Sequence, residues 1–256
     1  MNTNNTQTKV FDLPTRLFHW VFAALFIGAF AIGKFVDDEA AIYPYHMMMG
    51  ILAIFALGLR IIWGVFGTKY ARFSSFKLNP MALLDYFKSV FAGNKKPTLE
   101  RNPASSFAAF AMFALVIALG ISGYLMATSS NESQMHDIKE VHEVIAILFL
   151  VIVIAHIIGI IIHTIKQKDP IGLSMITGEK SAVAGETGIG NNHSIIGILF
   201  LILMGGSTFA LANNYDAQNR KLNLFGQSLQ LGENEGAEGN EHGEAEQENE
   251  SDEDRD

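Results

Sequence analysis

Four of the eight histidines lie in or beside long apolar runs, where an ionisable side chain is costly and usually has a function. They are His19, His46, His142 and His156. His142 and His156 are fourteen residues apart. On one helix they would fall within about 40° of the same face and about 21 Å apart along the axis. Because one metal ion cannot bridge that distance, the spacing predicts two imidazole-ligated centres at two depths.

Five apolar runs are long enough to carry these histidines through a bilayer, which a helix crosses in about 20 residues. We predict them at 15–35, 46–66, 104–127, 141–165 and 194–212, the last with an interfacial segment as its alternative. The first run is too long for a typical signal-peptide core and lacks a small-residue cleavage site, so we expect it to be retained. Charged residues are only 17% of the chain. We therefore predict an all-α membrane protein.

Lysine and arginine indicate the topology, since they favour the cytoplasmic side of short loops. Seven of them lie between the second and third runs: Lys69, Arg72, Lys77, Lys88, Lys95, Lys96 and Arg101. Acidic residues dominate the loops after the first and third runs. We therefore expect a bacterial inner-membrane protein with a cytoplasmic N-terminus and a periplasmic C-terminal tail. A short amphipathic helix at 82–91 is expected on the cytoplasmic surface.

This topology pairs the histidines by depth. His46 would meet His142 near the outer surface, and His19 would meet His156 near the inner one. Each pair offers two imidazole nitrogens from different helices, as a six-coordinate haem iron requires, in a slot that is apolar enough for the porphyrin. The chain has no cysteine, which excludes covalently attached c-type haem, iron–sulfur clusters and thiolate metal sites. The prediction is two non-covalent b-type haems.

Each histidine also has a simpler interpretation, because a lone membrane histidine can hydrogen-bond a neighbouring helix. His163 competes with His156 as a ligand, since it lies seven residues further on the same face, but we interpret it as interfacial. The methionines at 47–49 could supply an axial ligand and are more typical of packing. The remaining histidines are expected to be solvated: His136, His193 and His242.

Two arginines are candidate partners of haem propionates. Arg60 lies fourteen residues after His46, and Arg16 lies three residues before His19. A guanidinium matches a carboxylate fork, and the alternative for both is a snorkelling cytoplasmic arginine. Four glycines within the runs either allow close helix contact or leave room for a flat macrocycle. They are Gly50, Gly58, Gly120 and Gly123.

The two ends of the chain are expected to be disordered. Residues 1–232 carry 17 basic and 14 acidic side chains, whereas 233–256 carry one basic and twelve acidic ones. We divide the chain into a disordered 1–11, a di-haem domain at 12–180, a linker at 181–193, the fifth span at 194–212 and a polar, acidic, disordered tail at 213–256. The tail could steer a basic periplasmic cytochrome c, or it could simply be solvated.

Several stretches, in this order, resemble the bacterial cytochrome b-561 family, which includes nickel–iron hydrogenase cytochrome b subunits. They are PTRLFHW (14–20), RIIWG (60–64), YARFSSF (70–76), NPA (102–104), VHE (141–143), AH (155–156) and MITG (175–178). The resemblance covers residues 10–180 and implies a four-helix bundle with two low-spin b haems. It also implies axial ligands at His19, His46, His142 and His156. The fifth run and the acidic tail depart from the family pattern.

The resemblance implies electron transfer between the membrane quinone pool and a partner, which in this family is often a periplasmic redox protein or a hydrogenase. We expect no catalytic side chains, and an enzyme only in the sense of a quinol-linked oxidoreductase or its cytochrome b subunit. Two other functions compete: a metal-ion transporter with intramembrane histidines, and a subunit that anchors a redox enzyme to the membrane. No basic stripe interleaved with aromatics supports nucleic-acid binding.

Overall fold

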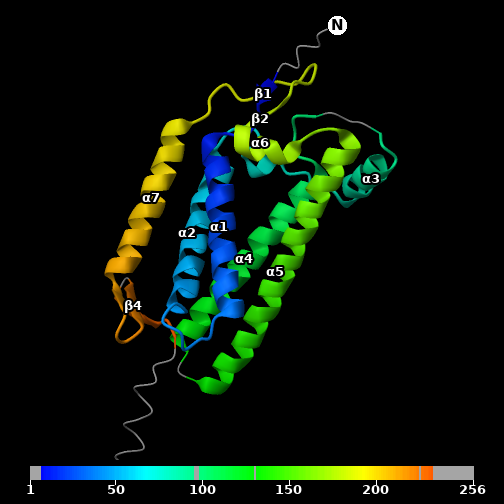
Figure 1. Cartoon of the computed structure of the whole chain (residues 1–256). Helices are drawn as coiled ribbons and strands as arrows, with labels where there is room; N and C mark the ends of the chain where they lie inside the picture. Colours follow the sequence, from blue (N-terminus) through cyan, green and yellow to red (C-terminus); the bar gives the residue numbers. More distant parts are fainter. Residues whose placement is uncertain (1–6, 95–97, 130, 225, 233–256) are drawn as a thin grey trace, which may run out of the picture.

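The computed structural model describes residues 7–94, 98–129, 131–224 and 226–232 (Figure 1). The long helices are α1 (Leu13–Phe35), α2 (Pro44–Phe66), α4 (Pro103–Thr128), α5 (Glu132–Gln167) and α7 (Ser194–Asn213). The short ones are η1 (Phe73–Ser75), α3 (Pro80–Phe91) and α6 (Ile171–Thr177). The strands are β1 (Gln7–Lys9), β2 (Glu179–Ser181), β3 (Tyr215–Asp216), β4 (Lys221–Leu224) and β5 (Gln227–Gln230).

Four of the helices begin at a side-chain cap, which satisfies backbone N–H groups that have no partner inside the helix. Asp12 caps α1, Asn79 caps α3, Asn102 caps α4 and Asn131 caps α5. A proline stands in the first turn of α1, α3 and α4, where its missing N–H costs nothing. The cap at Asn131 also explains why α5 begins nine residues before the apolar run that predicted it.

The first four long helices form a bundle. α1 packs along α2, α4 packs along α5, and α2 joins the two pairs through α4. The core between them contains Phe18, Leu52 and Ala56 in one cluster and Leu57 and Phe149 in another. α7 lies outside the bundle against α1 and α2 (Figure 1).

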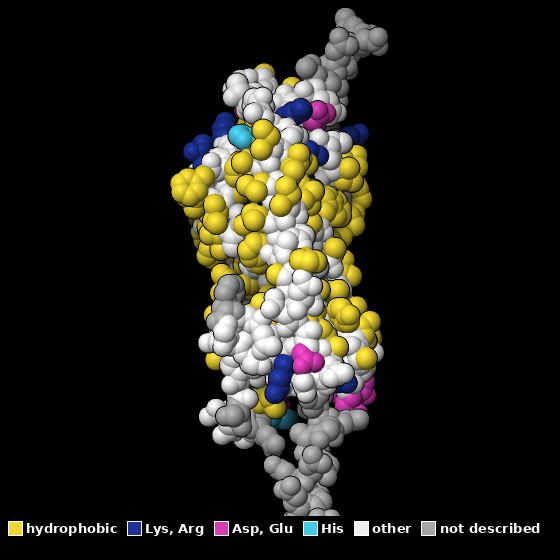
Figure 2. All heavy atoms as spheres, turned by 90° about the vertical axis from the view of Figure 1, so that its left-hand side faces the viewer, with side chains coloured by type: hydrophobic (Ala, Val, Ile, Leu, Met, Phe, Trp, Pro, Cys, Tyr) yellow, Lys and Arg dark blue, Asp and Glu magenta, His cyan; other side chains and the backbone are white. Residues whose placement is uncertain are grey.

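Within the described residues, five helices are long and apolar enough to cross a membrane, judged by length and composition: α1, α2, α4, α5 and α7. Large apolar side chains point outward from them; the exposed fraction is 65% for Ile27, 82% for Ile195 and 68% for Phe209. Figure 2 shows hydrophobic side chains over the middle of one face and charged ones toward its two ends. Such a surface fits lipid and not water. The chain is a multi-pass α-helical membrane protein, as the sequence predicted.

The bundle has two distinct ends. Following the predicted topology, we call the end that holds the start of α1 the inner end and the opposite one the outer end. The β1–β2 pair, α3 and α6 lie at the inner end, and the sheet containing β4 lies at the outer end (Figure 1).

The structure corrects the expected disorder at both ends of the chain. β1 pairs antiparallel with β2, and Val10 is buried. At 215–230, β3, β4 and β5 form an antiparallel sheet. The polar composition misled the prediction, but leucines alternate with polar residues and are buried: Leu222, Leu229 and Leu231. Arg220 also donates to the carbonyls of Asp38 and Glu39. Residues 1–6 and 233–256 lie outside the described residues.

Asp12 ties the start of α1 to the end of α2. Its fully buried carboxylate accepts from the Thr15 backbone N–H at 2.9 Å, from Trp63 Nε1 at 3.1 Å and from Thr68 Oγ1 at 2.5 Å.

We expect the Asp12→Ala substitution to lower the free energy of unfolding by about 3–5 kcal/mol, because it removes a cap and leaves buried donors without a partner. Unfolding in mixed SDS micelles would measure this loss. Asp85→Ala, on the exposed side of α3, is the control and should change stability by less than about 0.5 kcal/mol. An equal small loss in both variants would contradict a structural role for Asp12.

Candidate functional site

His46 and His142 face each other near the outer end. His46 lies in the first turn of α2 and His142 in α5, and their ring centres are 6.1 Å apart with the planes at 71°. Two imidazoles bonded to one metal ion at about 2 Å have ring centres about 6 Å apart. The spacing therefore fits a metal ion held between the two rings.

The other ring nitrogen of each histidine already has a partner. His46 Nδ1 lies 2.8 Å from the Ala29 carbonyl oxygen, so Nδ1 must donate. His142 Nδ1 lies 2.8 Å from Ser122 Oγ, whose hydroxyl can donate to the Ala118 carbonyl at 2.9 Å and accept from the imidazole. A hydrogen bond at Nδ1 fixes the tautomer and leaves Nε2 as the ligand atom. Both rings are thus prepared to bind a metal.

Glycines make room around this pair. A Cβ at Gly33 would lie 2.7 Å from His46 Nδ1, so the ring packs against the backbone of α1. A Cβ at Gly123 would lie 3.7 Å from His142 Cε1, and one at Gly50 would meet no atom within 4 Å. Open space therefore lies one helical turn beyond His46, where a flat macrocycle would need it. Gly58 is equally open, whereas Gly120 packs closely against Ile54.

His19 and His156 form the second predicted pair, at the inner end. They are close enough to interact electrostatically, and the charge of Arg101 acts on both. His156 lies fourteen residues after His142 on α5. The structure thus brings the His46 and His142 rings to 6.1 Å of each other, and it brings His19 and His156 within electrostatic range.

Three arginines at the inner end each have a buried donor without a partner. Arg60 is only 4% exposed and donates from Nη2 to the Ala71 carbonyl at 2.9 Å, while its Nη1 has no partner. Arg16 donates to the Ile176 carbonyl and Arg101 to that of Tyr70, and each has an unpaired Nε. Unpaired buried donors are costly, which favours an acidic group from outside the chain. Haem propionates have this chemistry.

Arg60 and Arg101 also repel each other. Burial of the guanidinium and the charge of Arg60 lower the pKa of Arg101 to about 10. Phenylalanine faces cover part of both cations, with Arg101 Cζ 4.8 Å from the Phe76 ring centre and Arg60 Cζ 5.4 Å from that of Phe73. An anion placed between them would relieve the repulsion. The buried position of Arg60 does not fit the snorkelling interpretation.

Two of these residues escaped the sequence analysis. Arg101 was interpreted only as a marker of topology, although its charge acts on both inner histidines. Ser122 was not considered; its only signal was a hydroxyl in the middle of an apolar run.

The remaining candidates have other roles. His163 hydrogen-bonds Tyr86, and exposed His136 lies within α5, not in a loop, near Glu140. His193 precedes α7 beside Trp63, and Met47 and Met48 pack in the core, while His242 lies outside the described residues. Across the described part of the chain, no three or more His, Cys, Asp or Glu side chains gather around one point.

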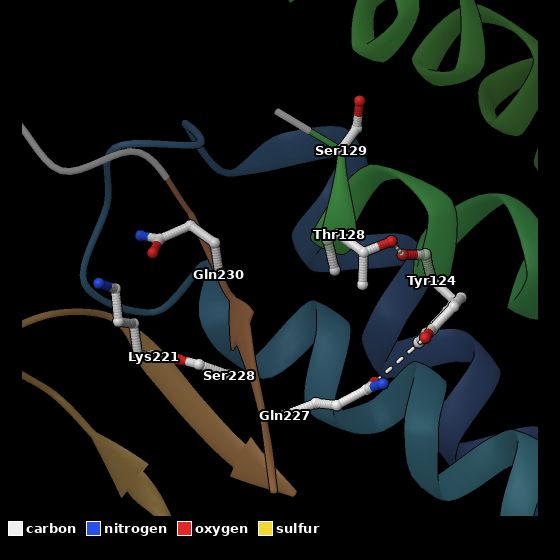
Figure 3. Close-up of a pocket in the computed structure, with 8 residues that line it drawn as sticks. Tyr124, Thr128, Ser129, Lys221, Gln227, Ser228 and Gln230 are labelled. Carbon is white, nitrogen blue, oxygen red and sulfur yellow. Dashed lines mark hydrogen bonds between the residues drawn. The ribbon is translucent and has the colours of Figure 1, made fainter. Parts of the chain in front are cut away.

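A polar recess of about 480 Å³ opens at the outer end, between the end of α4 and the sheet (Figure 3). Tyr124 and Gln227 are joined across it by a 3.1 Å hydrogen bond. Its lining contains no histidine and one lysine, Lys221. The recess is therefore separate from both histidine pairs.

We expect the Ser122→Ala substitution to raise the midpoint potential of a centre held by His142. Losing the acceptor makes the imidazole less basic and favours the reduced metal. A hydrogen bond of about 0.5–1.5 kcal/mol corresponds to about 20–60 mV for one electron. Potentiometric titration would measure the shift. Ser105→Ala, in the first turn of the same helix, is the control, and a matching shift there would refute the assignment.

Comparison with known proteins gives one match. The family model of prokaryotic cytochrome b561 matches residues 10–178. No curated protein and no solved structure matches the chain.

Proposed function

Because the chain belongs to the prokaryotic cytochrome b561 family, we propose that it is a di-haem b-type cytochrome that transfers electrons between the quinone pool and a redox partner. Family membership and the apolar helices establish a membrane b-type cytochrome of electron transfer. The number of haems, the quinone and the partner belong to the proposal. Its main support is the outer pair, where His46 and His142 stand 6.1 Å apart with both Nδ1 atoms hydrogen-bonded.

We assign one haem to each histidine pair. When bound, a b haem supplies one-electron exchange at iron. His46 and His142 would hold the outer one, and His19 and His156 the inner one. A separation of about 21 Å along α5 would put one haem in each half of the bilayer. The arrangement is suited to moving electrons across the membrane.

The surrounding residues position the cofactors and tune their potentials. Arg16, Arg60 and Arg101 would donate to the propionates of the inner haem from their unpaired atoms. Their positive charge favours the reduced state there. Ala29 and Ser122 orient the outer histidines through their Nδ1 atoms, and the apolar core would keep water away from a bound haem.

The quinone and the partner are inferred from the membrane setting. A quinol dissolved in lipid can reach either haem from the side of the bundle. We place the inner end in the cytoplasm of a bacterial cell, because basic loops favour that side. The partner is then a periplasmic cytochrome c or a redox-enzyme subunit, which the acidic sequence at 233–256 would attract if it is basic.

The observed geometry is less suited to a metal-ion transporter. Transporters bind their ion with ligands that converge near the middle of the membrane. Here the histidines lie in two pairs at two depths, and the buried arginines at the inner end would repel a cation.

A reduced-minus-oxidised optical spectrum, with a pyridine haemochrome count per chain, tests the proposal. We expect two b haems with low-spin bands, and reduction by a short-chain ubiquinol. A colourless protein that is correctly inserted in haem-replete cells would rule the proposal out. If the protein contains two haems but quinol does not reduce them, the proposal of a di-haem cytochrome stands and the proposal of a quinone substrate fails.

A further inference from the structure

We propose that Tyr86, His163 and Asp169 form a proton relay between the cytoplasmic surface and a quinone headgroup bound beside the inner histidine pair. The inference rests on the proposed function and adds to it the route of the protons. Quinone chemistry needs such a route, because quinol formation takes up two protons with two electrons. The haem centres carry only the electrons.

A continuous hydrogen-bonded chain joins the three side chains. Tyr86 Oη lies 2.8 Å from His163 Nδ1, and His163 Nε2 lies 3.5 Å from Asp169 Oδ2. The tyrosine and imidazole rings are stacked, with centres 6.1 Å apart and planes at 17°. An imidazole can accept a proton at one nitrogen and release another from the opposite one. With both nitrogens engaged in this way, His163 is not available as a haem ligand.

The hydrogen-bonded series of side chains leads from the membrane to water. Tyr86 belongs to α3, which exposes Met81, Leu84 and Phe87 on its apolar side. The side chain of His163 is 12% exposed and that of Asp169 is 28% exposed. Exposure thus increases from the imidazole to the carboxylate, which is the terminus that cytoplasmic water can reach.

The relay stands close to the inner histidine pair. His163 follows His156 by seven residues, which places it about 20° away around α5 and about 10 Å along it. Gly159 lies between them on the same side, is exposed, and would meet no atom within 4 Å if it carried a Cβ. A flat headgroup could therefore approach the backbone of α5 between the haem ligand and the relay.

The charges around His163 suit proton transfer. The titratable groups that contact it are Tyr86 from α3 and Asp169 from the loop after α5. Lys180 from β2 lies behind this pair, with its Nζ 3.8 Å from Asp169 Oδ2. Burial favours a higher pKa for Asp169, but its hydrogen bond with His163 and the charge of Lys180 outweigh burial and lower it. Burial and the charge of Asp169 raise the pKa of Tyr86 to about 12. Asp169 is therefore anionic at rest and can accept a proton in passing, and Tyr86 releases a proton only as it gains another.

The proton and electron balance is simple. When a quinol is oxidised, its two electrons would leave one at a time, to the b haems that the histidine pairs would hold. Its two hydroxyl protons pass to Tyr86 and His163, then to Asp169 and water. Quinone reduction runs the same steps in reverse, with two protons taken from the cytoplasm.

The test uses the full-length, haem-loaded protein in nanodiscs, with decylubiquinol as the electron donor. The variants are His163→Gln and Tyr86→Phe, and the control is His136→Gln, an exposed histidine on the same helix. We expect both relay variants to be reduced by the quinol about 10- to 100-fold more slowly, with an altered pH profile. Imidazole in the buffer should partly restore the rate of a His163→Ala variant.

Two further measurements separate a relay from a structural role. Reduction by dithionite, which needs no quinol proton, should proceed at the same rate in all variants. Electrochemical infrared difference spectra with labelled histidine should contain a protonation signal that His163→Gln removes. If His163→Gln loses haem, the quinol-reduction rate of Tyr86→Phe tests the relay instead, because this substitution removes only one hydroxyl.

The possible outcomes are distinct. Quinol reduction that is as fast in both variants as in the wild type would overturn the relay and leave the proposed function in place. Equal slowing with quinol and dithionite would also overturn the relay. A wild-type protein that quinol cannot reduce would overturn the quinone function and the relay with it.

Discussion

Replacement of His46 by alanine is expected to reduce the haem content from the proposed two per chain to one. His142 would be left as a single ligand opposite an empty position, and one imidazole holds a b haem poorly in a site built for two. The inner pair lies about 21 Å away along α5 and should keep its haem. Haem counting and redox titration of the purified protein would measure the loss, with one Nernst component remaining.

The matched variants make this prediction specific. His142→Ala should have the same result as His46→Ala, because the two residues face each other in one pair. His19→Ala should remove the other haem and leave the complementary component. His136→Ala is the control, since this exposed histidine lies on the same helix as His142. Loss of both haems from His46→Ala, in a protein that remains folded, would show that the two centres are not independent.

The approach of His46 to His142 could be predicted from the sequence for a physical reason. Helical rise and rotation determine where His142 and His156 lie relative to each other, and the loop charges orient each span. Depth in the membrane then limits which helices can pair. In the structure, the ring centres of His46 and His142 are 6.1 Å apart, and His19 and His156 lie within electrostatic range.

The partners of those histidines could not be predicted in the same way. The hydrogen bond from His142 to Ser122 depends on the rotation of α4 against α5, which an evenly apolar α4 does not specify. Arg101 lies in a loop, and the folding of that loop onto the inner end brings it near His19 and His156. Tyr86 and His163 are 77 residues apart, and the docking of α3 on α5 joins them.

The sheet at 215–230 escaped prediction because composition and pattern disagree there. Asparagine, glutamine and glycine are typical of disordered segments. Yet Leu222 and Leu229 are cross-strand partners and bury the same face of the sheet. Arg220 then ties the sheet to the loop between α1 and α2. Short strands of this kind gain their stability from the helices on which they pack, a contribution that no local pattern records.

Substitution of Arg60 by glutamine is expected to lower the midpoint potential of the inner haem by about 70 mV. A positive charge favours the reduced state, so its removal favours the oxidised one. A unit charge about 10 Å away contributes about 1.7 kcal/mol at an effective dielectric constant of about 20. For one electron this energy corresponds to about 70 mV. Potentiometric titration, resolved into two components, would measure the shift.

The controls separate the charge of Arg60 from its hydrogen bonds. Arg60→Lys retains the charge without the planar fork, and should shift the potential by less than half as much. Arg72→Gln removes an exposed charge at the same end, where water screens it, and should have little effect. The midpoint potential of the outer haem, which is the component that His46→Ala removes from the titration, should not change in Arg60→Gln.

The size and location of the shift distinguish the two interpretations of the buried arginines. If Arg60 served only to brace the inner end through Ala71, its loss would destabilise the fold and change both haems alike, or neither. If Arg60 and Arg101 hold a propionate together, removal of Arg60 exposes that carboxylate to a single cation. The inner potential then falls alone, and a second substitution, Arg101→Gln, should lower it further or release the haem. Equal shifts of both components would therefore contradict the assignment of these arginines to the inner haem.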